Sequence, residues 1–113
     1  MLIKKSNSIK SKNSDSCTVS EYDLPSKNLS LATAIINGRY PDQGMSANTD
    51  CELVYYCIDG RGVVHLEDDQ SYLEPGDVYY IPKQVKYFIE GNNLELVILN
   101  APKWTKEQYQ HFE

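Results

Sequence analysis

The sequence predicts a single all-β domain. Short apolar segments rich in Val, Ile, Leu and Tyr alternate with Gly, Pro, Asn and Asp, which is typical of strands joined by turns. No stretch shows a sustained helical period. Nine of the 113 residues are Tyr, a residue that favours strands. Together these features favour a β-sandwich or a β-barrel.

Six or seven strands are expected along the chain. The first lies at residues 29–37 and ends at the turn signal Asn37-Gly38. The second lies at residues 51–58 and ends at a similar signal, Asp59-Gly60. The last residues are expected to form one short C-terminal helical turn, with Pro102 near its start. Further strands are expected at residues 63–66, 78–82, 85–93 and 94–100.

The N-terminal region differs in composition from the rest. It is mostly Ser, Lys and Asn, with few apolar residues to anchor it. Such a segment is typical of a flexible tail, and an arm packed on a partner subunit is the alternative. We therefore divide the chain into an N-terminal arm or tail at residues 1–20 and a barrel at residues 21–113. No apolar segment follows the first lysines, so we expect no signal peptide.

The strand expected at residues 51–58 is apolar on both faces. A strand with one face in water alternates apolar and polar residues more cleanly. We therefore expect the outer face to be covered, and a homodimer built face to face through its sheets explains the pattern. One face would carry Cys51, Leu53, Tyr55 and Cys57, and the other would carry Glu52, Val54, Tyr56 and Ile58.

Charge and cysteine content narrow the class of protein. The net charge of −5 argues against nucleic-acid binding, and no apolar run is long enough to cross a membrane. Three cysteines without a secretion signal indicate reduced thiols and a cytoplasmic location. We interpret Cys17, Cys51 and Cys57 as buried, unreactive thiols, with a reactive nucleophile as the alternative.

Residues 38 to 104 resemble a small single-domain cupin. The cupin pattern is G-x5-H-x-H, three or four residues, then E-x6-G, followed later by G-x5-P-x-G-x2-H-x3-N. Gly60, Gly76 and Pro82 match this pattern, and "LEPGDVYYIPKQVKYF" reads like the phrase in which a Gly-Asp turn starts a strand ending at Ile-Pro. The resemblance implies a cupin-type jelly-roll β-barrel.

The resemblance also gives the positions of the family's metal ligands, and none of those ligands is retained. The Glu of the pattern falls on Leu53 and the His of the second motif falls on Tyr87. Apolar side chains offer no lone pair to a divalent ion. We therefore expect no metal and no other cofactor. The two remaining His positions fall on Ala47 and Thr49, or on Ser46 and Asn48 with one more spacer residue.

The positions that line the barrel mouth in cupins are part apolar and part hydrogen-bonding here. That mixture suits a small molecule such as a carbohydrate or a related metabolite, bound without a metal. The alternative is that Leu53, Tyr55 and Tyr87 fill the barrel, which would indicate a structural or interaction protein. The ligand-binding candidates are Asn48, Thr49, Leu53, Tyr55, Gln84 and Tyr87.

His65 provides a third interpretation, an enzyme. Some cupins that isomerise or epimerise nucleotide-linked sugars work without a metal, using a His base and a Tyr acid. By this resemblance, His65 and Tyr87 are the catalytic candidates, with Tyr55 as a substitute acid. The competing interpretation is an ordinary, half-exposed strand histidine.

Overall fold

The computed structural model describes residues 1–113 and forms one curled antiparallel sheet of nine strands. Two short 3-10 turns accompany the strands, and the second of them confirms the helical turn expected near the C-terminus. The all-β prediction is confirmed. The strands are β1 (Ile9–Ser14), β2 (Cys17–Tyr22), β3 (Ser30–Tyr40), β4 (Met45–Asn48), β5 (Glu52–Leu66), β6 (Gln70–Leu73), β7 (Val78–Ile81), β8 (Tyr87–Ala101) and β9 (Tyr109–Phe112), and the turns are η1 (Lys5–Asn7) and η2 (Lys106–Gln108).

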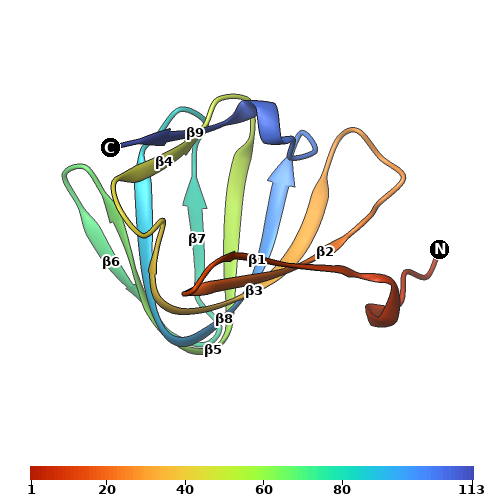
Figure 1. Cartoon of the computed structure of the whole chain (residues 1–113), viewed down its shortest axis with the longest axis horizontal. Helices are drawn as coiled ribbons and strands as arrows, with labels where there is room; N and C mark the ends of the chain where they lie inside the picture. The colour runs from red at the N-terminus through yellow and green to blue at the C-terminus, as the bar shows by residue number, and fades with distance from the viewer.

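Strand β8 is the centre of the sheet. It pairs with β3 on one side and with β5 on the other, and its first residue, Tyr87, pairs with Ser46 of β4. β5 in turn pairs with β7 through its first half and with β6 through its second half. Figure 1 shows β5 and β8 curving together at the bottom of the view, with β4 and β9 at the top. This curvature brings the two halves of the sheet to face each other.

The strands are longer than the turn signals suggested. The segments expected at 51–58 and 63–66 form the single strand β5, and most of residues 85–100 form the single strand β8. The pairing register shifts around Asp59 in β5 and before Gly38 in β3. Asn37-Gly38 and Asp59-Gly60 therefore lie at bends within continuous strands and not at strand ends. Bulges and glycines allow a strand to bend sharply without losing its pairing.

Glycine is required where β5 and β8 bend, because the backbones of neighbouring strands approach each other closely there. Gly60 has φ +78°, and a Cβ placed on it would lie 2.0 Å from the carbonyl oxygen of Asn93. Gly91 has ordinary φ, but its Cβ would lie 2.5 Å from the carbonyl oxygen of Ile36. Both contacts are with backbone, which cannot move aside, so any side chain at either position would push β3, β5 and β8 apart.

The core lies on the inner face of the curled sheet. Leu53, Tyr55 and Cys57 of β5 are buried, while Tyr56 between them is exposed, as strand alternation requires. The core cluster comprises 14 residues and includes Leu94 and Leu96 of β8, neither of which has any exposed surface. All three cysteines are buried and unpaired.

The N-terminal segment is part of the sheet. β1 and β2 form a hairpin, and β2 pairs along its whole length with β3. Cys17 and Val19 of β2 are buried in the core cluster, because alternate residues of β2 face inward. The division expected after residue 20 therefore falls inside β2. Cys17 and Val19 alternate with polar residues in β2, as in a strand with one buried face. The surrounding Ser, Thr and Lys residues gave this segment the composition of a flexible tail.

The outer face of the sheet carries several exposed apolar side chains. Tyr56 and Ile58 of β5 are 45% and 44% exposed, and Val78 of β7, which pairs with Tyr56, is 60% exposed. We propose that a second copy of the chain covers this face, as the two apolar faces of β5 indicated. None of the helices has the length and apolar character needed to traverse a lipid bilayer.

Replacing Gly60 should cost more stability than replacing a glycine with similar φ in open space. Gly76 has φ +95° and nothing within 4 Å of a built Cβ, so Gly76→Ala should lower the free energy of unfolding by about 1–2 kcal/mol. Gly60→Ala adds the collision with Asn93, about 1–3 kcal/mol more. Urea denaturation of both variants measures the difference in the free energy of unfolding. Equal losses of this free energy would contradict a close backbone approach at Gly60.

The proposed dimer predicts a mass of two chains in solution, each of 12.9 kDa. Tyr56→Lys combined with Val78→Lys should halve that mass in light scattering at micromolar concentration, because buried unpaired charges disfavour the contact. Leu29→Lys, in the segment between β2 and β3 where Leu29 is 43% exposed, is the control and should leave the mass unchanged. A single-chain mass for the parent protein excludes the dimer.

Candidate functional site

The curled sheet encloses a cavity of about 440 Å³. Side chains from β1, β2, β3, β4, β5, β8 and β9 line it, together with the loop after β2 and the connection from β8 to β9. Pockets of about 300–1,000 Å³ accommodate small organic molecules. The barrel is therefore not completely filled by its own side chains.

Five tyrosines and Trp104 provide the aromatic surface of the cavity, and four of the tyrosines contact one another in pairs. The rings of Tyr55 and Tyr87 meet edge to face, with centroids 6.4 Å apart. The hydroxyl oxygens of Tyr40 and Tyr109 lie 3.4 Å apart, and Tyr109 also hydrogen-bonds Ser46. Such a set offers flat apolar faces and hydroxyl groups side by side, which suits a ring bearing polar substituents.

Burial keeps the phenols of Tyr55 and Tyr87 protonated. It raises the pKa of Tyr87 well above the ordinary value, and the neighbouring Tyr109 raises it further. Burial also raises the pKa of Tyr55, with Tyr87 as the next cause. The thiol of Cys17, on the same cavity wall, has its pKa raised to about 11 by burial. Near neutral pH these groups are uncharged hydrogen-bonding partners, and the thiol is not an activated nucleophile.

Two buried amides add directional polar groups. Asn48 of β4 is 3% exposed, and Asn100 of β8 is 8% exposed. The Asn48 Oδ1 accepts a hydrogen bond of 2.9 Å from Nε2 of Gln108 in η2, and Asn100 Nδ2 donates to the carbonyl oxygen of Glu52 at 3.5 Å. These two amides thus supply polar groups to the cavity wall without adding a charge.

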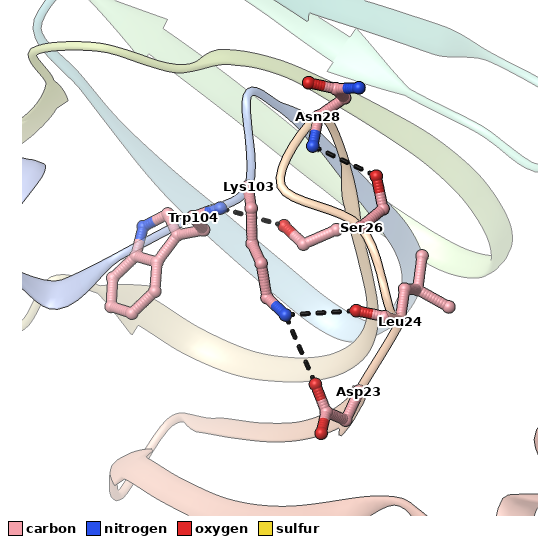
Figure 2. A network of polar contacts seen from close by, with 7 residues as sticks. Asp23, Leu24, Ser26, Asn28, Lys103 and Trp104 are labelled. Atoms are coloured by element: carbon pink, nitrogen blue, oxygen red, sulfur yellow. Dashed lines mark hydrogen bonds and ion pairs between the residues drawn. The ribbon is translucent and has the colours of Figure 1, made fainter.

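Two of the three charged residues that line the cavity, Asp23 and Lys103, lie on chain connections, and the third, Glu21, belongs to β2. Lys103 Nζ donates to Asp23 Oδ1 at 3.2 Å and to the Leu24 carbonyl oxygen at 3.1 Å, as Figure 2 shows. The backbone N–H of Trp104 donates to Ser30 Oγ at 3.1 Å. These bonds fasten the loop after β2 to the connection after β8. They hold the indole of Trp104 against the cavity, with its centroid 6.0 Å from that of Tyr109.

Solved structures with the same architecture identify the fold. Pac13 of Streptomyces, described as a nucleoside dehydratase, superposes with a TM-score of 0.89 at 16% identity, covering 100% of this chain and 91% of that chain. KdgF of Halomonas superposes with a TM-score of 0.78 at 14% identity, covering 92% of this chain and 96% of that one. Oxalate decarboxylase of Bacillus subtilis gives 0.81 at 16% identity, covering 96% of this chain and 31% of that one. The fold is cupin-like.

Sequence comparison adds less to this assignment. No protein-family model matches the chain. An uncharacterized protein of Methanocaldococcus jannaschii, MJ1618, is 32% identical over 65 residues, which are 55% of this chain and 52% of that protein. The chain therefore spans about half the length of the curated relative that it matches.

The cupin-like barrel brings four of the six ligand-binding candidates together. Asn48, Leu53, Tyr55 and Tyr87 all line the cavity. Thr49 and Gln84 do not line it, and their roles are local. Thr49 Oγ1 donates to the backbone oxygen of Gln108 at 3.0 Å. Gln84 is exposed with φ +68°, a left-handed backbone conformation in a turn.

His65 lies on the outer face of the cupin-like sheet. Its ring stacks on Phe88 with centroids 4.2 Å apart, and its Nε2 lies 2.6 Å from Glu90 Oε1. The guanidinium of Arg39 lies over the ring of Phe88, 3.9 Å from its centroid. Tyr87, the next residue to Phe88, points inward to the cavity. His65 and Tyr87 therefore face opposite sides of the sheet.

Several cavity residues were absent from the sequence-based candidates. Cys17 comes from the hairpin that resembled a tail, and Tyr40 and Asn100 come from the ends of long strands. The strand alternation of β2 is the one local signal that marks Cys17 as inward-facing. Tyr109 carries no such signal, because it reaches the cavity through the pairing of β9 with β4, which is remote in sequence.

The residues at the cupin metal position do not fit a divalent ion. Leu53 and Tyr87 stand at two ligand positions of the cupin pattern, and both line the cavity. Ser46, at a third, is engaged with Tyr109. Nowhere in residues 1–113 do three His, Cys, Asp or Glu side chains converge as a metal would require. The available donors are phenols, amides and hydroxyls.

The raised pKa values of Tyr55 and Tyr87 predict loss of stability in alkali. Above the ordinary tyrosine pKa of 10.0, the unfolded chain releases phenolic protons that the folded chain retains. The free energy of unfolding should therefore fall as the pH rises past 10, by up to about 1.4 kcal/mol per pH unit for each phenol. Urea denaturation from pH 8 to 11 measures this slope. Tyr87→Phe should make the decline shallower, whereas the exposed-site control Tyr72→Phe should not.

Proposed function

We propose that the cupin-like barrel binds an uncharged small molecule with a polar ring, such as a carbohydrate or a related metabolite, without a metal ion. The observation that carries this proposal is the cavity of about 440 Å³, whose lining is mostly apolar and aromatic, with phenols and amides among its polar groups. Solved structures of the similar protein Pac13 with uridine add support, since a nucleoside combines a sugar with a planar ring.

The chemistry of the wall explains the preference for a neutral ligand. An anion would need a buried positive partner, and the cation that borders the cavity, Lys103, is already paired with Asp23. A neutral ring can instead lie against Tyr55 or Trp104 and exchange hydrogen bonds with Asn48 and the phenols. Each such bond contributes about 0.5–1.5 kcal/mol.

The sugar isomerase or epimerase interpretation receives less support. Such a reaction needs a base near the ligand, and His65 faces away from the cavity toward Glu90. The phenols with raised pKa values are poor bases near neutral pH. A structural protein with a filled barrel is also disfavoured, because the cavity has the size of a ligand pocket.

Thermal shift and calorimetry with uridine, ribose, glucose and galactose test the proposal. A ligand at a hundredfold excess over its Kd should stabilise the folded chain by about 2.7 kcal/mol. Tyr87→Phe should weaken binding about three- to tenfold by removing one hydrogen bond. His65→Ala is the matched control and should leave affinity unchanged.

Two outcomes would contradict the proposal. Absence of any shift with all four neutral compounds would remove the support for this ligand class. A strong, saturable shift with Mn²⁺, Fe²⁺ or Zn²⁺ would show that the chain holds a metal by donors other than those at the cupin positions. A loss of binding in His65→Ala would instead revive the enzyme interpretation.

A further inference from the structure

Gln108 is a buried residue that does not line the cavity, but its side chain hydrogen-bonds Asn48, which does. It belongs to η2 and is 3% exposed. Its Oε1 accepts from the backbone N–H groups of Asp50 and Cys51, each at 3.3 Å. Its Nε2 donates to Asn48 Oδ1 at 2.9 Å. Gln108 therefore connects the start of β5 to a side chain in the cavity wall.

Hydrogen-bond complementarity determines the orientation of both amides. A backbone N–H can only donate, so the end of Gln108 that faces Asp50 and Cys51 must be its oxygen. The other end of Gln108 is then an NH2 group, which requires an oxygen opposite it. Asn48 must therefore turn its Oδ1 toward Gln108, which leaves its NH2 group as the end available to the cavity.

The surroundings of Tyr87 agree with this orientation. Burial raises the pKa of the Tyr87 hydroxyl, and hydrogen bonding from the Asn48 amide acts in the opposite direction, as a donor does. An NH2 group carries two N–H bonds. One of them can serve Tyr87 while the other remains for a ligand.

We infer that Gln108 is a positioning residue that makes Asn48 a hydrogen-bond donor to the cavity, so that the site selects ligands with an acceptor, such as a carbonyl oxygen, at that point. This inference rests on the proposed function for its ligand, but the orientation itself does not. Gln108→Glu keeps the acceptor for Asp50 and Cys51 and removes the donor. Asn48 must then turn its NH2 group toward the carboxylate and present its oxygen to the cavity.

The orientation is tested on the ligand-free protein by NMR detection of couplings across hydrogen bonds. The expected result is a correlation from the Gln108 Nε2–H to the Asn48 Cγ. In Gln108→Glu the direction should reverse, with a correlation from the Asn48 Nδ2–H to the substituted carboxylate carbon. A correlation from Asn48 Nδ2–H to the Gln108 Cδ in the parent protein overturns the inference, whether or not any ligand binds.

The selectivity is tested with uridine and cytidine, which differ at ring position 4, where a carbonyl oxygen is replaced by an amino group, and at the adjacent N3, which donates in uridine and accepts in cytidine. The parent protein should bind uridine about tenfold more tightly, and Gln108→Glu should remove or reverse that ratio. Thr49→Val is the matched control, because it loses a bond to the Gln108 backbone and leaves the side-chain contacts intact. A ratio that is unchanged in Gln108→Glu overturns the selectivity.

Two further outcomes separate this inference from the proposed function. If neither nucleoside binds while the parent correlation is present, the choice of a nucleoside ligand fails and the orientation stands. If Gln108→Glu does not fold, Gln108→Met supplies the test. Its side chain has similar length and no amide, so it should release Asn48 and bring the uridine-to-cytidine ratio toward one, while an unchanged ratio overturns the inference.

Discussion

The close approach of the backbones of β3, β5 and β8 at the glycines of the bend is the constraint on which the cavity depends. Gly60 and Gly91 allow backbone carbonyl groups to approach where a Cβ would stand. This lets strands of 15 residues turn a corner without breaking their pairing. Both halves of each strand then contribute to the same enclosed space. A sheet of the same strands without that corner would be flatter, and Tyr55 and Tyr87 would not meet.

The cavity combines apolar walls with polar groups whose directions are set from outside it. Tyr55 and Tyr87 are held by the packing of their rings, and their hydroxyls stay protonated because burial disfavours the charged form. Asn48 is held by Gln108, which is in turn held by backbone groups. Because residues outside the cavity lining fix these side chains, the site has defined donor and acceptor positions. Binding a ligand then costs little side-chain conformational entropy.

Strand alternation decides which of the chemically suggestive residues can act together. His65 and Tyr87 belong to paired strands, yet the side chain of His65 leaves the sheet on one face and that of Tyr87 on the other. His65 instead stacks on Phe88 and hydrogen-bonds Glu90. A histidine in a strand therefore gives no indication of catalysis until its face is known, since neighbouring residues in sequence point in opposite directions.

Local chemistry in the sequence determined the all-β class, the cupin-like phrase around Gly76 and Pro82, and the inward face of Leu53 and Tyr55. These follow from strand alternation and turn preferences, which act over a few residues. Tertiary structure alone decided that Asp59-Gly60 is a bend, that Tyr109 reaches the cavity, and that Gln108 orients Asn48. Each of these depends on contacts between segments far apart in the chain, such as the pairing of β9 with β4 or the contact of η2 with β4. Nothing in the nearby sequence records such contacts, because the same local preferences are compatible with many long-range pairings.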